Sequence, residues 1–450
     1  MPAMVPNSIW PLLKHWDPAP STGYHLRHFN RNDGVYMHID GIDKAVQKIN
    51  LDFAVGNGQI LKGKVVNIIS DDKVEIIVGQ RQLTATVNTR LEWGRDYLFQ
   101  VKQHKEPPVL QVLNNGADQD NSTQFEVRQM MNILKLKDDP VIEMLIKSLI
   151  KADIPITRDL LLSAKHLLAQ SHSLESGIKT VEWMVRHRLP LEKDFFQSVE
   201  SLFQEEHLST HANRLLHQMM PMPNRTNAMM ALARFLHSLP AANHESSNWL
   251  DMLVNKIGFQ HENLLSSFAS NNKGNNQLNE TLKSLVLKLI QDTETPSQLK
   301  PAAEMMLKSI TGQQLQMVSN DETLVQLLMQ LPIRSKDKFD NVSIYWEGKR
   351  SRSGQIDSGN CQIFCRLDLN QLNEMLVHIR IQKKNMTIKI HNNYTGLGTA
   401  LRKWEDLLRM RLEEAGFRLV SLSQVQLEEG KRDDILTDMI IDKSHLDVKI

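Results

Sequence analysis

The spacing of apolar residues changes twice along this chain of 450 residues, and the changes separate three regions. Between residues 57 and 113, apolar and polar residues alternate, which is typical of half-buried strands. From residue 125 to 335, apolar residues recur every three or four positions with capping residues at most restarts, which predicts helices. From residue 341 to 450, alternation returns and is followed by one helical pattern. The sequence therefore predicts a multidomain protein with a small β-barrel at 57–113, an α-helical domain at 125–335 and an α+β domain at 341–450.

The first region resolves into short strands separated by turn residues. Alternation places Val74, Ile76 and Val78 on one face of a strand, which is the pattern of a half-buried sheet. Several such strands in so short a region are typical of a small closed barrel, and an OB-like or SH3-like barrel fits best. We expect its core to include the aromatic residues Trp93, Tyr97 and Phe99. The expected strands begin near Ile60, Lys73, Gln82, Asp96 and Val109.

The helical region contains two segments of similar pattern, "IPITRDLLLSA" from Ile154 and "LPLEKDFFQSV" from Leu189, which start 35 residues apart. This spacing suggests stacked helical hairpins, and because two copies do not make a solenoid we expect a compact α-helical domain. Polar or proline-marked joints are expected at residues 114–124 and 331–338. Residues 1–36 contain no periodic pattern, and Met37 begins a stretch that resembles an ordinary start. For residues 1–56 we therefore expect a disordered arm or an over-extended start, followed by a lead-in to the barrel.

The last region contains a candidate β-hairpin. In "LNEMLVHIRIQKKNMTIKIHN", residues 372–392, apolar and polar residues alternate on both sides of a break at Lys383, Lys384 and Asn385, which predicts two strands joined by a tight turn. A helix is expected over residues 397–415, with Gly416 as its stop and a final strand after it. The expected apolar stripe of this helix, packed on Val377, Ile379 and Ile381, consists of Leu401, Trp404, Leu408 and Leu412.

Motifs that carry chemistry are not evident in the sequence. His207 and His211, with Glu206 beside them, have a spacing at which two imidazoles on a helix can bind one metal ion, but among 17 histidines such a pair is expected by chance. We therefore expect an exposed helix face there and no metal site. No P-loop, Gly-x-Ser-x-Gly elbow or triad-like cysteine is found, so we expect no catalytic residue, no cofactor and no enzymatic activity. The cysteines, Cys361 and Cys365, are about 13 Å apart in a strand, too far for a disulfide.

The charges of the whole chain nearly cancel, with 53 Lys and Arg residues against 52 Asp and Glu residues. No global field therefore favours nucleic acid or an anionic membrane. The sequence has neither a run of about 18 apolar residues nor a Sec signal, so we expect a cytoplasmic protein without membrane insertion. Charge is locally uneven, because residues 341–427 hold thirteen basic and eight acidic residues.

The C-terminal region resembles a known family. "CRLDLNQLNEMLVHIRIQKKNMTIKIHN" and the helix "LGTALRKWEDLLRMRLEEAGF" resemble the C-terminal domain of flagellar hook-length control proteins, in which a Leu-x-Leu strand, a β-hairpin, a helix with spaced leucines, a glycine and a final strand follow in this order. "GQILKGKVVNI", "RQLTATV" and "LEWGRDYLFQV" resemble the N-terminal module of Gram-positive hook-length-control-like proteins. "TGQQL" and "WEGKRSRSGQIDSGNCQIF" resemble the middle region of the same proteins.

This resemblance implies a non-enzymatic protein of the bacterial flagellum and its type III secretion (export) apparatus. Its C-terminal domain would bind the cytosolic domain of an export-gate switch protein and end the export of hook components, and the protein could itself leave through that apparatus. An exposed basic sheet face suits an acidic partner, so we expect the partner to bind the polar side and turn of the hairpin. The expected partner-binding residues are His378, Arg380, Gln382, Lys383, Lys384 and Lys389.

The alternative is a single-stranded nucleic-acid-binding protein that uses its OB-like barrel. Residues 57–113 hold eight Lys or Arg residues and six Asp or Glu residues, which is a weak electrostatic footprint for such a partner. We therefore rank nucleic acid below a protein partner.

Overall fold

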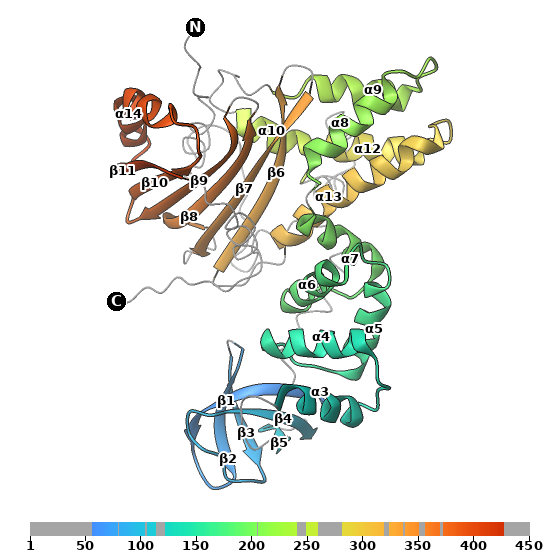
Figure 1. The fold of residues 1–450 in the computed structure, drawn as a ribbon, viewed down its shortest axis with the longest axis vertical. Helices are drawn as coiled ribbons and strands as arrows, with labels where there is room; N and C mark the ends of the chain where they lie inside the picture. Colours follow the sequence, from blue (N-terminus) through green and yellow to red (C-terminus); the bar gives the residue numbers. More distant parts are fainter. Residues whose placement is uncertain are drawn as a thin grey trace, which may run out of the picture. The chain divides into compact units, whose positions relative to one another are not determined.

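The computed structural model describes residues 56–79, 81–103, 106–113, 122–204, 206–240, 249–259, 281–318, 324–335, 338–350, 356–369 and 372–426. The chain divides into two compact units, one that ends at Phe203 and one that begins at Gln204 and continues to the C-terminal region (Figure 1). Residues 1–55 of the expected arm and lead-in, most of the joint at 114–124 and residues 427–450 lie outside the described residues. Within the described residues, no helix is both long and apolar enough to cross a membrane.

The first unit begins with a closed five-stranded barrel, as predicted. Its strands follow the order β1-β2-β3-β5-β4, with β3 and β5 parallel and β4 closing onto β1, which is a Greek-key barrel of the OB type. Gly63 permits this closure, because a Cβ there would lie 3.1 Å from Ile76 Cδ1 and 3.2 Å from Phe99 Cε2. The strands are β1 (Ile60–Ile68), β2 (Lys73–Val78), β3 (Arg81–Val87), β4 (Asp96–Gln103) and β5 (Val109–Val112).

The barrel core follows the predicted alternation, with one exception. Tyr97 and Phe99 are buried as expected, but Trp93 is 74% exposed. Trp93 lies in the turn before β4, next to Gly94 with φ +80°, so the alternation of the strand does not direct its side chain inward. Its Nε1 donates to the carbonyl oxygen of Val66 at 3.0 Å, which fixes the indole on the surface.

The helices of the first unit repeat one geometry. Asp153 and Arg188, 35 residues apart, follow the ends of two helices with φ of +53° and +55°, and the next residues, Ile154 and Leu189, are each 6% exposed. The predicted repeat is therefore a repeated helix end in which a left-handed residue is followed by a buried apolar one. The helices are α3 (Ser122–Ile133), α4 (Pro140–Lys151), α5 (Arg158–Leu168), α6 (Leu174–Arg186) and α7 (Lys193–Glu200), followed by the 3-10 turn η1 (Ser201–Phe203).

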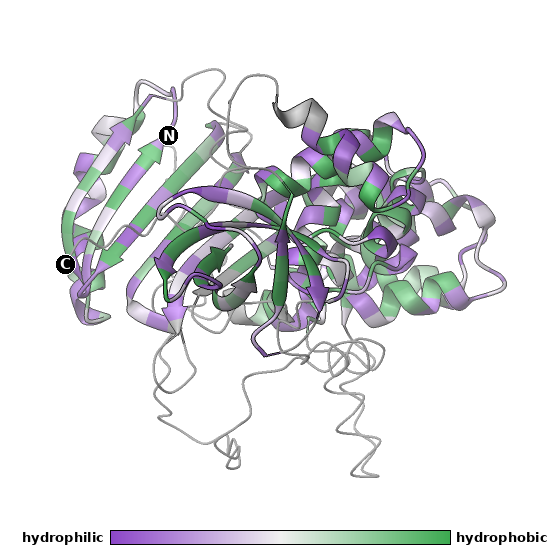
Figure 2. Cartoon of the chain, turned by 90° about the horizontal axis from the view of Figure 1, so that it is seen from below, coloured by the Kyte–Doolittle hydropathy of each residue, from purple (hydrophilic) through white to green (hydrophobic). Residues whose placement is uncertain are grey.

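The second unit joins helices to a six-stranded sheet through one apolar core. The strand order is β11-β10-β9-β8-β7-β6, antiparallel except that β11 runs parallel to β10, and Figure 2 shows hydrophobic and hydrophilic residues alternating along its strands. The helices before the sheet are α8 (Leu208–Met219), α9 (Asn227–His237), α10 (Trp249–Ile257), α12 (Leu282–Gln291) and α13 (Lys300–Val318). The strands are β6 (Leu324–Ser335), β7 (Lys338–Arg350), β8 (Ile356–Leu369), β9 (Asn373–Gln382), β10 (Asn385–His391) and β11 (Arg418–Val425).

The predicted fold class is confirmed, but the boundary between helices and sheet is not where we expected it. Residues 324–335, assigned to the helical domain, form strand β6. The joint expected at 331–338 is therefore wrong, because residues 331–335 belong to β6 and pair with β7, which begins at residue 338. Leu328 and Met329 are both buried although they face opposite sides of β6. The strand therefore lacks the alternation by which a half-buried strand is recognised.

Polar side chains of α13 and α8 cover the edge of the sheet at β6 and β7. The backbone N–H of Leu328 donates to Gln316 Oε1 at 2.9 Å, and that of Gln330 donates to Gln313 Oε1 at 2.6 Å. Asn213 of α8 bonds both the N–H and the carbonyl of Phe339. Gln313, from the "TGQQL" segment, and Gln316, which directly follows it, thus accept from N–H groups of an edge strand that would otherwise have no partner.

Helix α14 (Leu397–Glu414) joins β10 to β11 and ends at Gly416, whose φ of +81° suits the left-handed stop predicted for it. Leu412 is fully buried, and Leu401 and Leu408 pack on the same core, as expected. Trp404 was expected there too but is 45% exposed. The helix face that meets the core includes Arg409, whose Nη1 donates to the carbonyl of Leu419 at 2.6 Å. The helix is therefore rotated relative to our expectation, and Trp404 lies at the edge of the contact with the core.

Candidate functional site

The expected partner-binding residues share one face of the C-terminal sheet. The register pairs His378 with Lys389 across β9 and β10 and pairs Gln382 with Asn385, so His378, Arg380, Gln382 and Lys389 point to the side opposite the apolar core. Arg380, Gln382 and Lys389 are exposed. Ile379 and Ile381, between them in sequence, are almost fully buried. We call the exposed side of β8–β11 nearest the hairpin turn the basic face.

An aromatic pair lies within the basic face. The ring of His378 stacks on that of Phe364 from β8, with centroids 4.0 Å apart and an interplanar angle of 14°, and His378 Nε2 is 3.3 Å from Gln362 Oε1. Burial, followed by the nearby cations Lys389, His391 and Arg380, lowers the pKa of His378 to about 4. His378 is therefore neutral at pH 7, and it can offer the face an aromatic surface and a hydrogen bond but no charge.

The hairpin turn presents two lysines in an uncommon backbone conformation. Lys383 and Lys384 have φ of +50° and +64°, the pair of left-handed values that a two-residue type I′ turn requires. Non-glycine residues adopt this region at a cost. Contacts with neighbouring strands hold them: Lys384 N–H donates to the carbonyl of Gly359, and Arg418 N–H donates to that of Lys384. Both lysine side chains are exposed at the end of the sheet.

Sequence reasoning missed two members of this face, Arg418 and Phe364. Arg418, at the start of β11, is paired with Asn385 next to the lysine turn and is exposed. A parallel β11 could not be registered against β10 from the sequence, because α14 separates the two strands. The alternation of "NCQIFCRLD" before the hairpin does place Phe364 on the same side as Gln362 and Arg366, so this signal was available in the sequence.

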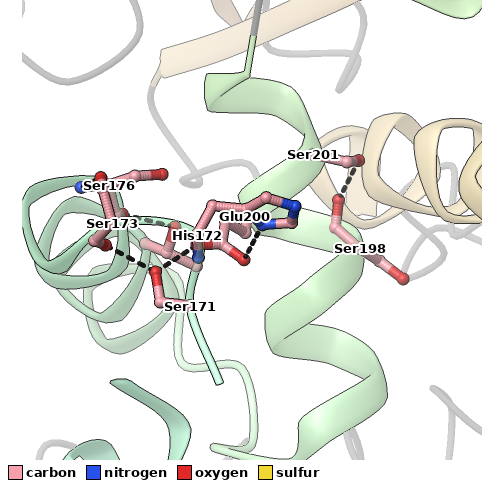
Figure 3. Close-up of polar contacts among 8 residues, drawn as sticks. Ser171, His172, Ser173, Ser176, Ser198, Glu200 and Ser201 are labelled. Carbon is pink, nitrogen blue, oxygen red and sulfur yellow. Dashed lines mark hydrogen bonds and ion pairs between the residues drawn. The ribbon is translucent and has the colours of Figure 1, made fainter. Parts of the chain in front are cut away.

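A second polar cluster, in the first unit, arranges serine, histidine and glutamate differently from a catalytic triad (Figure 3). Ser171 Oγ donates to Glu200 Oε1, and His172 Nδ1 lies 3.4 Å from Glu200 Oε2. In a triad the hydroxyl bonds the imidazole and the imidazole bonds the carboxylate, whereas here both groups turn to the carboxylate of Glu200, which is 1% exposed. The cluster joins the end of α7 to the turn before α6.

The pair His207 and His211 does not form the exposed face that we expected. His211 is fully buried, and neither of its ring nitrogens has a hydrogen-bond partner. Its Nδ1 lies 3.8 Å from Glu206 Oε2, and burial lowers its pKa more than Glu206 raises it. The prediction was wrong because the apolar residues around His211 in α8 carry it into the core with them. Among the described residues, no group of three or more His, Cys, Asp or Glu side chains could hold a metal ion.

The two cysteines lie on the apolar side of β8. Both Cys361 and Cys365 are free and buried, and burial raises the pKa of Cys365 to about 12 and, with Asp357, that of Cys361 to about 11. Such thiols are protonated at neutral pH and unreactive. They are therefore core residues.

Comparison with known proteins shows a distant relative and no matching family. The chain is 27% identical over 174 residues to "Uncharacterized protein YlqG" of Bacillus subtilis (strain 168). The match covers 38% of this chain and 30% of that relative, so it spans less than a third of the relative's length. No family model matches the chain. No solved structure matches it.

Proposed function

We propose that this protein is a non-enzymatic member of the flagellar hook-length control group, and that its basic face binds the cytosolic domain of an export-gate switch protein. One observation carries the proposal: the exposed cations Arg380 and Lys389, with Lys383 and Lys384 at the turn, stand on a sheet whose other side is a packed core. A rigid basic face of this kind steers an acidic partner and fixes its orientation. Action in the cytoplasm, or export through the type III apparatus, would accompany this function.

The order of elements supports the proposal. Strand β8, the β9–β10 hairpin, α14, Gly416 and β11 follow in the order that the resemblance to hook-length control proteins leads us to expect. Asn373, the first residue of β9, has a φ of +56°, which asparagine tolerates better than most residues.

A binding titration tests the proposal. The cytosolic domain of the switch protein from the same organism is titrated with wild type and with a double variant, Arg380→Glu with Lys389→Glu. Both residues are exposed, so the fold should be retained, within about 0.5 kcal/mol of unfolding free energy for each change. We expect binding at least about tenfold weaker, mainly through slower association, and a smaller dependence on salt than in the wild type.

The matched control is Arg402→Glu with Lys403→Glu, which changes the charge by the same amount at two exposed positions of α14. It should bind like the wild type. If both double variants bind equally, the basic face is not the interface. If the wild type does not bind at all, the partner is wrong.

One observation favours the alternative, a single-stranded nucleic-acid-binding barrel. Trp93, held on the surface by its bond to Val66, offers an indole on which a base could stack. Asp71 and Asp72 lie in the β1–β2 loop, a loop with which OB barrels contact nucleic acid. Their negative charges would repel a phosphate backbone, which counts against this alternative. Binding of single-stranded DNA with steep salt dependence, lost in Trp93→Ala, would favour this alternative.

A further inference from the structure

A polar cavity of about 420 Å³ lies within the second unit, at the end of the sheet far from the hairpin turn. It opens where α8 begins, at His207 and Thr210, and where β7 begins, at Asp340 and Asn341. Residues at the end of β8 and the start of β9 complete the wall. A cavity of this size holds a ligand of a few to about twenty non-hydrogen atoms. We call it the acidic pocket.

Carboxylates outnumber cations around the acidic pocket. Asp340, Asp368 and Glu374 line it together with a single lysine, Lys338. Lys338 Nζ lies 3.2 Å from Asp340 Oδ1. Arg366 Nε lies 2.9 Å from Glu374 Oε1 but 3.7 Å from Asp368 Oδ1. Counted over the residues that the structure describes around the pocket, three carboxylates against these two cations leave one negative charge. Asp368, with a side chain 39% exposed, is the carboxylate held at the longest distance.

A buried amide supplies an independent sign of a missing ligand. Asn341 is 4% exposed and lines the pocket. Its Nδ2 donates to Ser343 Oγ at 2.9 Å, whereas its Oδ1 has no hydrogen-bond partner. A buried acceptor without a hydrogen bond lowers stability by about 1 to 3 kcal/mol, so a ligand that donates to Asn341 Oδ1 would remove this unfavourable free energy.

We propose that the acidic pocket binds a cationic nitrogen head group, an ammonium or a guanidinium, which donates to Asn341 Oδ1 and faces Asp368. Both groups are acceptors, and a nitrogen cation supplies charge and several N–H donors at once. The amino end of α8 adds a partial positive charge to the same cavity, so a monocation matches the net charge better than a divalent ion. The inference is independent of the basic face, which lies at the other end of the sheet.

Titrations with small salts test the proposal on the full-length protein. The probes are n-butylguanidinium chloride and n-butylammonium chloride, with sodium butyrate and magnesium chloride at equal ionic strength as comparisons, followed by ligand-observed NMR and calorimetry. We expect saturable binding of at least one organic cation and none of butyrate or magnesium. Asp368→Asn and Asn341→Leu should each weaken that binding about tenfold.

The matched control is Glu413→Gln, which removes one carboxylate from an exposed position of α14 outside the pocket and should leave binding unchanged within twofold. Asp368 is partly exposed, so its variant remains informative even if Asn341→Leu misfolds. Absence of saturable cation binding, equal binding of butyrate, or equal binding by Asp368→Asn and wild type would each overturn the proposal.

A further probe, the peptide N-acetyl-Gly-Arg-Gly-amide, distinguishes two sources of the head group. If it binds more than tenfold tighter than n-butylguanidinium and loses this advantage in Asp368→Asn, the pocket takes an arginine side chain from another protein. If the free cation binds as tightly, the pocket takes a small molecule. Each result supports the pocket and identifies its occupant.

Discussion

At the scale of the residue, neighbours in β9 have opposite environments. Ile379 is fully buried in the core, whereas Arg380, the next residue, is exposed on the basic face. Strand geometry sends successive side chains to opposite sides, so stability and partner binding are separated by single steps along the chain.

Ile379→Ala should lower the free energy of unfolding by about 2 to 5 kcal/mol, because it leaves a cavity in the core. Arg380→Ala should change it by less than about 0.5 kcal/mol. Urea denaturation of both variants checks this pair. Similar losses in the two variants would mean that the register of β9 is wrong.

The lysine turn gives a prediction of opposite sign. Lys384→Gly should raise the free energy of unfolding by about 1 kcal/mol, because glycine adopts a φ of +64° without steric cost. The matched control, Lys389→Gly within β10, should lower it by about 0.5 to 1 kcal/mol. Chemical denaturation compares the midpoints. A destabilised Lys384→Gly would show that the left-handed turn does not form.

His378 predicts how stability depends on pH. Its pKa is lowered to about 4, against an ordinary value near 6.5, so the unfolded chain binds the proton more readily than the folded one. The stability that neutral His378 provides is complete above pH 6.5 and is lost as the pH falls from 6.5 toward 4. The total is on the order of 2 to 3 kcal/mol.

The variant His378→Phe isolates this effect, since it keeps a ring against Phe364 and cannot titrate. Denaturation at pH 7.5 and pH 4.5 should show a smaller loss of stability in the variant than in the wild type. Other histidines of lowered pKa, such as His391 and His211, titrate in both proteins and cancel in the comparison. Equal losses of stability in the two proteins would show that folding does not lower the pKa of His378.

At the scale of the element, β6 shows why some strands escape detection. Its sequence, "LVQLLMQLPIRS", carries apolar residues on both faces of the strand, and Leu328 and Met329, on opposite faces, are both buried. Glutamines of α13 bond the free edge of the same strand. A run of this kind fits a buried strand or a buried helix equally well. The hairpin β9–β10, which has one side exposed to solvent, was predicted from its alternation.

The cover of β6 is testable through one glutamine. Gln313→Leu should lower the free energy of unfolding by about 1 to 3 kcal/mol, because it leaves the buried N–H of Gln330 without its acceptor. Glu304→Leu, at an exposed position of the same helix, is the control and should be nearly neutral. Thermal and urea unfolding measure both. A neutral Gln313→Leu would mean that the bond contributes nothing.

At the scale of the whole molecule, the chain forms two units where the sequence indicated three regions. The helices from α8 onward share a core with the sheet, whereas α3 to α7 belong to the unit of the barrel. Periodicity identified the helices but not their partners, because contacts between elements far apart in sequence leave no local pattern. The exposure of Trp93 and Trp404 was missed for the same reason, since only the neighbouring elements decide which side of a turn or a helix is covered.

The division predicts that two fragments fold alone. Residues 56–203 and residues 204–450, expressed separately, should each unfold cooperatively and at the same urea concentration as the corresponding transition of the full chain. Circular dichroism and tryptophan fluorescence measure this. A cut at residue 340, near the boundary expected from sequence, should instead prevent cooperative unfolding of the second unit in both products, because it divides β7 and separates the helices from the sheet. The barrel unit, which lies wholly before the cut, should keep its own transition.

The strand order of the six-stranded sheet also determines how the second unit unfolds under mechanical force. Strands β6 to β11 succeed one another in space as they do along the chain. A force applied at the carboxyl end of β11 therefore detaches this edge strand first, then α14, which precedes it along the chain, and then β10, the new edge strand. Mechanical unfolding of this unit can proceed sequentially, one element at a time, and no segment has to pass through a loop. A chain built this way offers a translocation motor a series of small barriers in place of one large one.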